Sequence, residues 1–328
     1  MTIRCATLMI PAFAGVAALA MAAVPAHAQS DFPNRPVRLV NPYSPGGSVD
    51  LVGRAVAQGL TELWGHPVIV DNRPGAGTQI GTEIVVRSDP NGYTMLVNSS
   101  AIAINPSIYR KMRFDPIKDL YPIVGVSQSS PMLAVYPGLP AKSVQELIAL
   151  AKSQPGKITV AASGIGSTNH LTAEMFKSMA DIDLLVVPYK GGGPAIIDLI
   201  GGQVKMFFNS AAQLLPHHQA GRLRVLATGA AERVEYAPDF PTVAEQGVPG
   251  FEASTWYGVY GPSGLPKLIA QQWNDSINKW LQSPQGVAYF RKNHMKRIGG
   301  SLETFAAFHK SEITRWGKVV KAAGVKPQ

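Results

Sequence analysis

The chain has 328 residues, of which 46% are hydrophobic and 16% are charged. This balance excludes an intrinsically disordered chain, because such chains are poor in apolar residues and rich in charge. A chain of this length indicates two lobes, each with its own hydrophobic core. The formal net charge of +9 is compatible with nucleic acid, an anionic surface or an anionic small ligand as partner, and does not choose among them.

Residues 1–28 have the features of a cleavable secretory leader. Arg4 supplies a positive start, residues 8–24 are apolar and uncharged, and residues 26–28 (AHA) form a small-x-small cleavage site. We therefore predict cleavage before Gln29. A retained membrane anchor is the alternative, but the apolar run is short for a membrane span and contains a proline. The single cysteine, Cys5, precedes the apolar run, so the mature chain is predicted to contain no disulfide and no thiolate metal site.

Beyond the leader, short apolar runs alternate with stretches of helical periodicity. The predicted strands cover residues 37–40, 68–70, 95–97, 158–162, 184–187, 204–208, 225–227 and 256–260. The alternation restarts near residue 130, and after residue 260 the pattern predicts helices only. Alternating strands and helices predict an α/β fold of two lobes, each a mainly parallel sheet flanked by helices. The helical tail is expected to pack back on the first lobe.

Three glycine-rich loops, at residues 43–48, 163–168 and 189–194, each join a predicted strand to the start of a predicted helix. The first turn of a helix has unpaired N–H groups and a partial positive charge, and glycine lets a ligand approach that backbone closely. Each loop is a potential anion site, although glycine could also serve only to close a tight connection. Ligands of open α/β sheets bind at the carboxyl ends of the strands. The loops therefore predict a cleft between the lobes that favours a carboxylate.

The sequence lacks each of the common motifs for catalysis or cofactor binding. Residues 164–169 lack the third glycine of a dinucleotide fingerprint, because Asn169 stands in its place. Neither a phosphate-binding P-loop nor a nucleophile elbow occurs. His170 and Glu174 have metal-ligand spacing but no third candidate nearby in the sequence. We therefore predict no enzyme, no cofactor and no metal site, and the export signal argues against nucleic acid as a partner.

Seven short motifs follow one another over nearly all of the mature chain. They are FPNRPVR (32–38), PYSPGGSVD (42–50), VDNRPGAG (70–77), PNGYT (90–94), GSTNHL (166–171), PYKGGGP (188–194) and DFPT (239–242). In the number and order of these motifs, the sequence resembles the Bug family, also called the TctC-like tripartite tricarboxylate transporter receptors.

The resemblance implies a two-lobed periplasmic-binding-protein fold of type 2, a "Venus flytrap". The first lobe is expected over residues 31–128 plus 255–328 and the second over residues 129–254. Such receptors are periplasmic and are not themselves embedded in the membrane. They bind a small organic carboxylate in the interlobe cleft and pass it to the membrane permease subunits of a tripartite tricarboxylate-type transporter.

The resemblance and the glycine loops together indicate candidate ligand-binding residues. These are Tyr43, Ser44, Gly46, Gly47, Ser99, Ser163, Gly166, Ser167, Thr168, His170, Tyr189, Gly192, Asn209 and Trp256. Asp50 matches an acidic residue of the family and is expected to cap the first helix. Lys205 stands where the family usually has an acidic residue, and its contact with ligand stays open.

Two other functions stay open at this stage. A ligand-sensing module that reports to a membrane sensor needs the same binding and closure as a transport receptor. An exported α/β enzyme needs a nucleophile or an acid–base pair in the cleft, and the sequence offers none. The carboxylate itself is not specified, because backbone amides recognise the acid group and not the body of the ligand. Di- and tricarboxylates, acidic amino acids and aromatic acids all fit.

Overall fold

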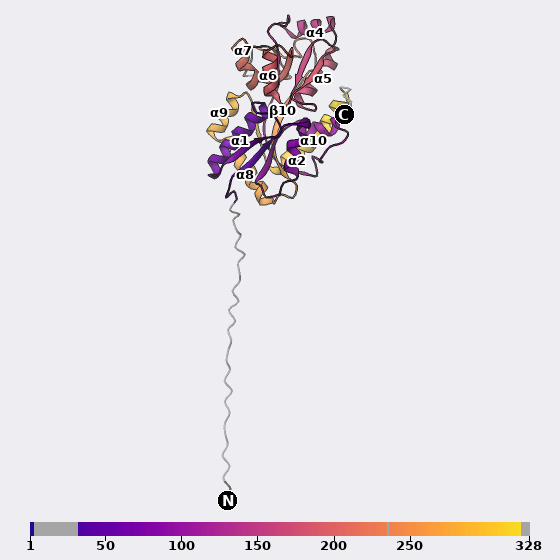
Figure 1. The fold of residues 1–328 in the computed structure, drawn as a ribbon. Coiled ribbons are helices and arrows are strands. Elements are labelled where there is room, and N and C mark those ends of the chain that lie inside the picture. Colours follow the sequence, from indigo (N-terminus) through magenta and orange to yellow (C-terminus); the bar gives the residue numbers. More distant parts are fainter. Residues whose placement is uncertain (3–31, 235, 323–328) are drawn as a thin grey trace. The chain divides into compact units, whose positions relative to one another are not determined.

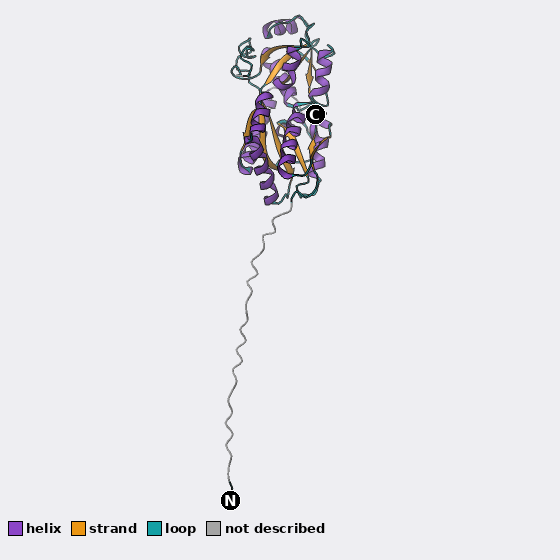
Figure 2. Cartoon of the chain, turned by 90° about the vertical axis from the view of Figure 1, so that its left-hand side faces the viewer, coloured by secondary structure: helices purple, strands orange, loops and turns teal. Residues whose placement is uncertain are grey.

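The computed structural model describes residues 1–2, 32–234 and 236–322 (Figure 1). Residues 33–322 lie in one compact unit. Almost all of the predicted leader, including its cleavage site, lies outside the described residues. The described strands form two sheets, and each sheet with the helices that pack on it forms one lobe (Figure 2).

The first sheet has six strands in the order β11-β4-β10-β3-β1-β2. They are β1 (Val37–Asn41), β2 (Val68–Asn72), β3 (Thr94–Ser99), β4 (Leu120–Ser129), β10 (Thr255–Pro262) and β11 (Lys296–Gly299). The second sheet has five strands in the order β7-β6-β8-β5-β9. They are β5 (Pro131–Val135), β6 (Thr159–Ala162), β7 (Leu185–Pro188), β8 (Met206–Ser210) and β9 (Arg224–Thr228).

The helices divide between the two sheets, as Figure 1 shows. Those of the first lobe are α1 (Ser48–Trp64), α2 (Gln79–Val86), α3 (Ala101–Ile108), α8 (Lys267–Gln282), α9 (Pro284–Lys292) and α10 (Leu302–Ala322). Those of the second lobe are α4 (Val144–Ser153), α5 (Thr168–Ala180), α6 (Gly192–Ile200) and α7 (Ala211–Gln219). Helix α1 ends at Gly65, whose left-handed backbone (φ +69°) places its N–H on the Thr61 carbonyl.

Both sheets are mixed, which corrects the expectation of mainly parallel sheets. In the first sheet β1 runs parallel to β2 and β3, whereas β10 runs antiparallel to both β3 and β4. The cause is the connection between lobes. Strand β4 leads into β5 of the second sheet, and β10 brings the chain back, so the two run in opposite directions. In the second sheet, β5 is antiparallel to β8 and β9.

The tail also contains a strand where only helices are predicted. Strand β11 is four residues long, pairs antiparallel with β4 and forms an edge of the first sheet. Its residues are mostly exposed, so no alternation of buried and exposed side chains marks it in the sequence. Helix α10 packs against α3 and β4 of the first lobe.

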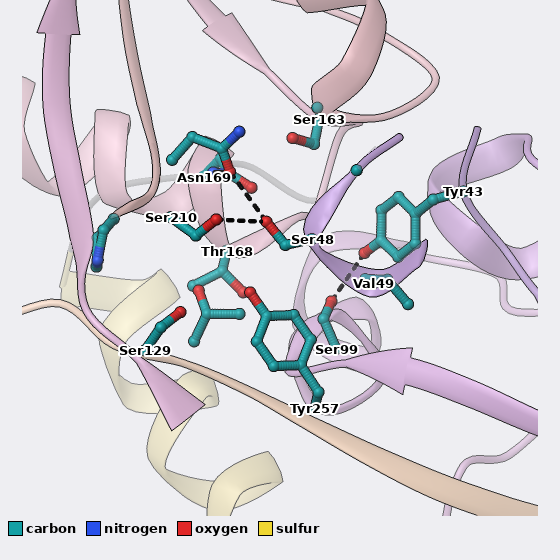
Figure 3. A pocket seen from close by; sticks show the side chains of 15 residues that line it. Tyr43, Ser48, Val49, Ser99, Ser129, Ser163, Thr168, Asn169, Ser210 and Tyr257 are labelled. Carbon is teal, nitrogen blue, oxygen red and sulfur yellow. Dashed lines mark hydrogen bonds between the residues drawn. The ribbon is translucent and has the colours of Figure 1, made fainter. Parts of the chain in front are cut away.

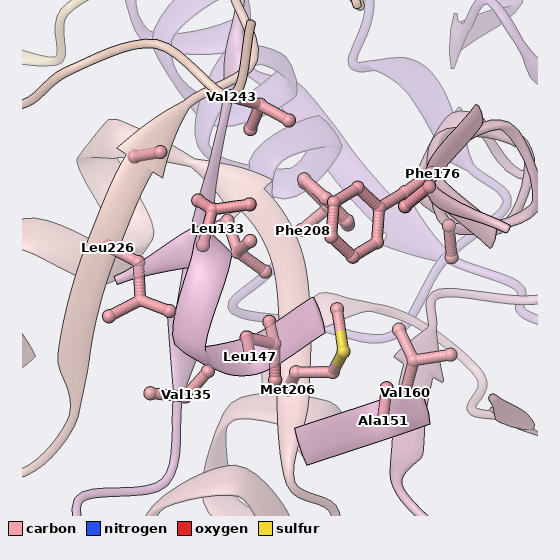
Figure 4. Close-up of a cluster of buried hydrophobic side chains, with 14 of the residues drawn as sticks. Leu133, Val135, Leu147, Ala151, Val160, Phe176, Met206, Phe208, Leu226 and Val243 are labelled. Atoms are coloured by element: carbon pink, nitrogen blue, oxygen red, sulfur yellow. The ribbon is translucent and has the colours of Figure 1, made fainter. Parts of the chain in front are cut away.

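One core cluster of the second lobe lies between its sheet and helices α4 and α5 (Figure 4), and another lies between the opposite face of the sheet and helices α6 and α7. Phe176 of α5 and Phe208 of β8 meet edge to face, with ring centroids 5.5 Å apart. Leu133 of β5 and Leu147 of α4 are fully buried in the same cluster. This packing makes the lobe a rigid support for the loops at the carboxyl ends of β6 and β8.

A buried histidine ties α10 to the first lobe. His309 is 2% exposed; its Nδ1 lies 3.1 Å from the Tyr260 hydroxyl and its Nε2 lies 3.2 Å from the Pro116 carbonyl. A neutral ring that donates from Nε2 and accepts at Nδ1 satisfies both contacts. Burial lowers the pKa of His309 to about 4, against smaller opposing effects of the Pro116 carbonyl and the Glu312 carboxylate.

We expect this histidine to make stability depend on pH. As the pH falls from 6.5, the ordinary pKa of histidine, towards 4, the unfolded chain binds a proton that the folded chain excludes. The free energy of unfolding should therefore fall over this window by about 3 kcal/mol. The variant His309→Gln should lose this part of the pH dependence. Urea unfolding of both proteins at pH 7, 5.5 and 4 checks it, and equal losses in the two proteins would contradict the assignment.

Candidate functional site between the two sheets

A cavity of about 30 Å³ lies where the loops of the two lobes meet (Figure 3). Most of its wall comes from residues at or just after the carboxyl ends of β1, β3, β4, β6 and β8, and the start of β10 completes it. The lining residues are Tyr43, Gly47, Ser48, Val49, Ser99, Ser129, Pro131, Ser163, Thr168, Asn169, Gly192, Asn209, Ser210, Thr255 and Tyr257. This position is where ligands bind in open α/β sheets.

Five helices begin at this cavity. The first turns of α1, α5 and α6 contribute Ser48, Thr168 and Gly192, respectively, as the glycine loops predict. Ser99 directly precedes the Ser100 N-cap of α3, and Ser210 is the N-cap of α7. Each helix start has N–H groups without an intrahelical acceptor and a partial positive charge. Five weakly positive helix N-termini therefore meet at the cavity, two from the first lobe and three from the second.

The side chains around the cavity are neutral. Among the described residues that line it, none is charged, and nine have a hydroxyl group. Burial raises the pKa of both Tyr43 and Tyr257, so both phenols stay protonated and can donate a hydrogen bond. Neutral hydroxyl and amide donors at helix starts suit a small anion, whose charge strengthens each hydrogen bond.

Asp50 fixes the position of the glycine-rich loop at residues 43–48 in the first lobe. Asp50 is only 3% exposed. Its carboxylate accepts hydrogen bonds from the Gly46 N–H (3.0 Å), Asn72 Nδ2 (2.9 Å) and Arg54 Nε (2.8 Å). Burial alone would raise the pKa of Asp50, but these hydrogen bonds outweigh it and lower the pKa. The N-cap of α1 is Gly47. Asp50 thus bonds the N–H just before the cap and positions the loop rather than touching the cavity.

His170 plays a comparable part in the second lobe. Its Nδ1 accepts the Gly166 N–H (3.3 Å), and its own backbone N–H donates to the hydroxyl of Ser167, the N-cap of α5 (3.2 Å). Burial lowers the pKa of His170, which favours the neutral ring that can accept. These hydrogen bonds therefore fix the shape of the loop without bringing Gly166, Ser167 or His170 to the cavity wall. Thr168 and Asn169, which directly follow Ser167, do line the cavity.

The loops of the two lobes contact each other directly around the cavity. The Ser48 and Ser210 hydroxyls are 2.8 Å apart, and those of Ser100 and Thr168 are 2.5 Å apart. Gln213 Nε2 donates to the Gly46 carbonyl (2.6 Å). The Ser44 N–H donates to the Lys190 carbonyl (3.0 Å). Ser44 and Gly46, predicted to bind ligand, therefore join the two lobes instead of lining the cavity.

The structure brings half of the predicted site residues to the cavity wall. These are Tyr43, Gly47, Ser99, Ser163, Thr168, Gly192 and Asn209. Tyr189 lies in an adjoining pocket. Lys205 lies away from the cavity, because its Nζ donates to the Gly202 carbonyl (2.6 Å) and sits over the Tyr136 ring.

Trp256 lies in the hydrophobic core and not in the cavity wall. It is 1% exposed, and its indole N–H donates to Glu312 of α10 (2.7 Å). Its neighbour Tyr257 lines the cavity instead, because successive side chains of a strand point to opposite faces.

Sequence reasoning missed several lining residues. They are Ser48, Val49, Ser129, Pro131, Asn169, Ser210, Thr255 and Tyr257. Some carry a usable signal: Ser210 is a hydroxyl residue at a strand-to-helix junction, and Asn169 follows a recognised glycine loop. Ser129, Pro131 and Thr255 lie where the chain passes between the two sheets, which local sequence does not reveal.

Comparison with known proteins finds a matching family and similar solved structures. The family model TctC, described as "Tripartite tricarboxylate transporter family receptor", matches residues 52–325. The solved periplasmic binding protein BugD is 31% identical, with a TM-score of 0.87 over 90% of this chain and 100% of that chain. An R. palustris protein solved with adipate is 34% identical, with a TM-score of 0.87 over 91% of this chain and 100% of that chain. MatC from Rhodopseudomonas palustris, solved with bound malate, is 26% identical, with a TM-score of 0.81 over 88% of this chain and 100% of that chain.

Proposed function

We propose, since the chain belongs to the TctC family of tripartite tricarboxylate transporter receptors, that it is a periplasmic receptor for a small organic carboxylate. It captures the acid in the cavity between its lobes and delivers it to a membrane permease. It acts by binding and release, without catalysis. The cavity residues Tyr43, Gly47, Ser99, Thr168 and Gly192 are proposed to contact the ligand.

The convergence of five helix starts on one cavity, lined by neutral side chains in the described chain, carries the proposal. An anion bound there forms charge-assisted hydrogen bonds. It does so without the free-energy cost of desolvating a charged side chain, which binding by a lysine or arginine would add. The adipate and malate of the two related structures are both carboxylates, which supports this class of anion. The lobes are proposed to comprise residues 31–128 plus 255–328 and residues 129–254, in keeping with the strands of the two sheets.

Lobe closure provides the mechanism. Helix starts of the first lobe and of the second lobe face the same cavity, so a ligand that bonds to both favours the arrangement in which they meet. The contacts Ser48–Ser210, Ser100–Thr168 and Gln213–Gly46 hold that arrangement. A membrane partner can then distinguish loaded from empty receptor by the relative position of the lobes.

We expect a carboxylate to stabilise the protein and its amide analogue not to do so. An amide has the shape of the acid but lacks the charge that strengthens hydrogen bonds to backbone N–H groups. At a hundredfold excess over Kd a ligand adds about 2.7 kcal/mol of stability, which raises the Tm by roughly 5 °C. A thermal-shift screen of acids, matched amides and neutral sugars checks this, with native mass spectrometry to identify any copurified acid. Stabilisation by sugars and by none of the acids would contradict the proposal.

Export is expected to remove the leader before Gln29. In the part of the chain that the structure describes, no helix combines the length and apolar character needed to cross a bilayer. When its N-terminus is sequenced, protein recovered from the periplasmic fraction should begin at Gln29, the residue after the predicted cleavage site. A sequence that begins at Met1 in exported protein would overturn the leader assignment.

A further inference from the structure

A second pocket, of about 400 Å³, adjoins the cavity. Tyr43 and Ser163 line both spaces and separate them; both are labelled in Figure 3. The outer walls include Tyr109 of the first lobe and Ile165, Pro188 and Tyr189 of the second. Both lobes thus contribute to this outer pocket, as they do to the inner cavity.

The outer pocket is largely apolar, because the three tyrosines that line it have their hydroxyls engaged in hydrogen bonds within the protein; that of Tyr43 lies 2.8 Å from the Ser99 hydroxyl. The Tyr109 hydroxyl donates to the Ile165 carbonyl (3.1 Å), and the Tyr189 hydroxyl donates to Asp198 of α6 (2.7 Å). The rings are left to form the wall, together with Ile165 and Pro188. Among the described residues lining the outer pocket, Lys190 is the charged one, and its side chain is exposed.

One edge of the outer pocket is a strained loop. Ala76 and Thr78 have positive φ values of 46° and 79°, which non-glycine residues rarely adopt. Between them, a Cβ on Gly77 would lie 2.0 Å from the Tyr109 hydroxyl and 2.6 Å from the Ile165 carbonyl. The backbone at Gly77 therefore lies closely against the second lobe. Strain of this kind persists where surrounding structure enforces it, often at ligand sites.

The sizes of the two spaces decide where a ligand must extend. A water molecule needs about 10–15 Å³ on this measure of volume, so a cavity of about 30 Å³ has room for two or three atoms the size of water. An acid group fills it. The two spaces share Tyr43 and Ser163, so the rest of a longer ligand can extend past these side chains into the outer pocket, which is more than ten times larger.

We propose that the outer pocket is a second subsite that takes the apolar body, an aryl or long alkyl group, of a carboxylate whose acid group lies in the inner cavity. This inference rests on the proposed function. Such a ligand contacts apolar walls of both lobes and stabilises their closure beyond what the acid group does. The receptor therefore selects carboxylates by the length and apolar character of the body that follows the acid.

The affinity of the unmodified protein for acids of increasing carbon-chain length tests this directly. Isothermal titration with butanoate, hexanoate, octanoate and 4-phenylbutanoate should show affinity rising about fourfold for each methylene that enters the pocket, the equivalent of about 0.8 kcal/mol per buried CH₂. Affinity that is the same for all four acids overturns the subsite while leaving carboxylate binding intact. Absence of binding by any acid, these four and the dicarboxylates succinate and adipate included, overturns the proposed function itself.

Two variants locate the effect. Ile165→Ala and Tyr189→Ala each remove one wall of the outer pocket and should weaken octanoate and 4-phenylbutanoate about tenfold, with less than a twofold change for butanoate. The matched control is Ile197→Ala, which deletes the same side chain at a position 71% exposed on α6 and should change no affinity. Urea unfolding confirms that each variant is folded. Equal weakening of short and long acids by both wall variants overturns the subsite.

Discussion

Replacement of Gly47 by valine is expected to weaken carboxylate binding about a hundredfold while lowering the free energy of unfolding by only about 1 kcal/mol. Gly47 lines the cavity and faces the second lobe, where a Cβ would lie 3.5 Å from the Gly192 backbone nitrogen. That contact is acceptable for one carbon, but the two further methyl groups of valine take up most of the roughly 30 Å³ that the acid group of the ligand needs. Overpacking of this kind costs about 1–3 kcal/mol, and it falls on the closed, ligand-bound arrangement. A hundredfold loss corresponds to about 2.7 kcal/mol.

Backbone strain contributes nothing to this prediction. The φ of Gly47 is −85°, a value that valine adopts readily. The remaining cost to folding is that valine is a poorer N-cap than glycine. Calorimetric affinity for the identified acid and urea unfolding without ligand separate the two effects.

Gly201 offers a matched control. A Cβ there would also have backbone neighbours at 3.5 and 3.8 Å, and its φ is −74°. Gly201 ends α6 and does not line the cavity. Gly201→Val should therefore lower stability by a similar amount and leave affinity unchanged. A Gly47→Val protein that loses stability yet binds the acid normally would show that the loop only connects β1 to α1.

The glycine loops could be predicted because the signal is local. A strand, a run of glycines and the start of a helix are adjacent in the chain, so the residues that specify the turn also place the helix end. The same holds for Gly65, which ends α1 in the left-handed conformation. Gly47, Thr168 and Gly192 reach the cavity for this reason.

The choice between Trp256 and Tyr257 could not be made from sequence. Adjacent residues of a strand face opposite sides, but β10 is buried on both faces along nearly its whole length. Its side chains therefore show no alternation from which the cavity side could be identified. The lining residues at 129, 131 and 255 depend on where the chain crosses between sheets, which is set by pairings distant in sequence.

The position of Trp256 leads to the second large effect: Glu312→Ala is expected to lower the free energy of unfolding by about 3–5 kcal/mol. Glu312 is 5% exposed, and its Oε2 accepts the indole N–H groups of Trp256 (2.7 Å) and Trp316 (3.0 Å). Its Oε1 accepts from Arg315 Nε (2.6 Å). Alanine leaves two buried indole donors without an acceptor, each at a cost of about 1–3 kcal/mol, and opens a space between α10 and β10. Urea unfolding without ligand measures the loss.

Glu312→Gln is the matched control, because its carbonyl oxygen can accept both indole N–H groups and its volume is the same. It should cost about 1 kcal/mol, the loss of a charge-assisted bond to Arg315, whose side chain is 50% exposed and can turn to solvent. Affinity for the acid, measured well below the unfolding transition, should change less than threefold in both variants, since Trp256 and Glu312 lie outside the cavity wall. Glu312→Ala protein that stays as stable as the parent but loses affinity as Gly47→Val does would mean that Trp256 acts at the ligand after all, and that its packing against α10 serves binding rather than the fold.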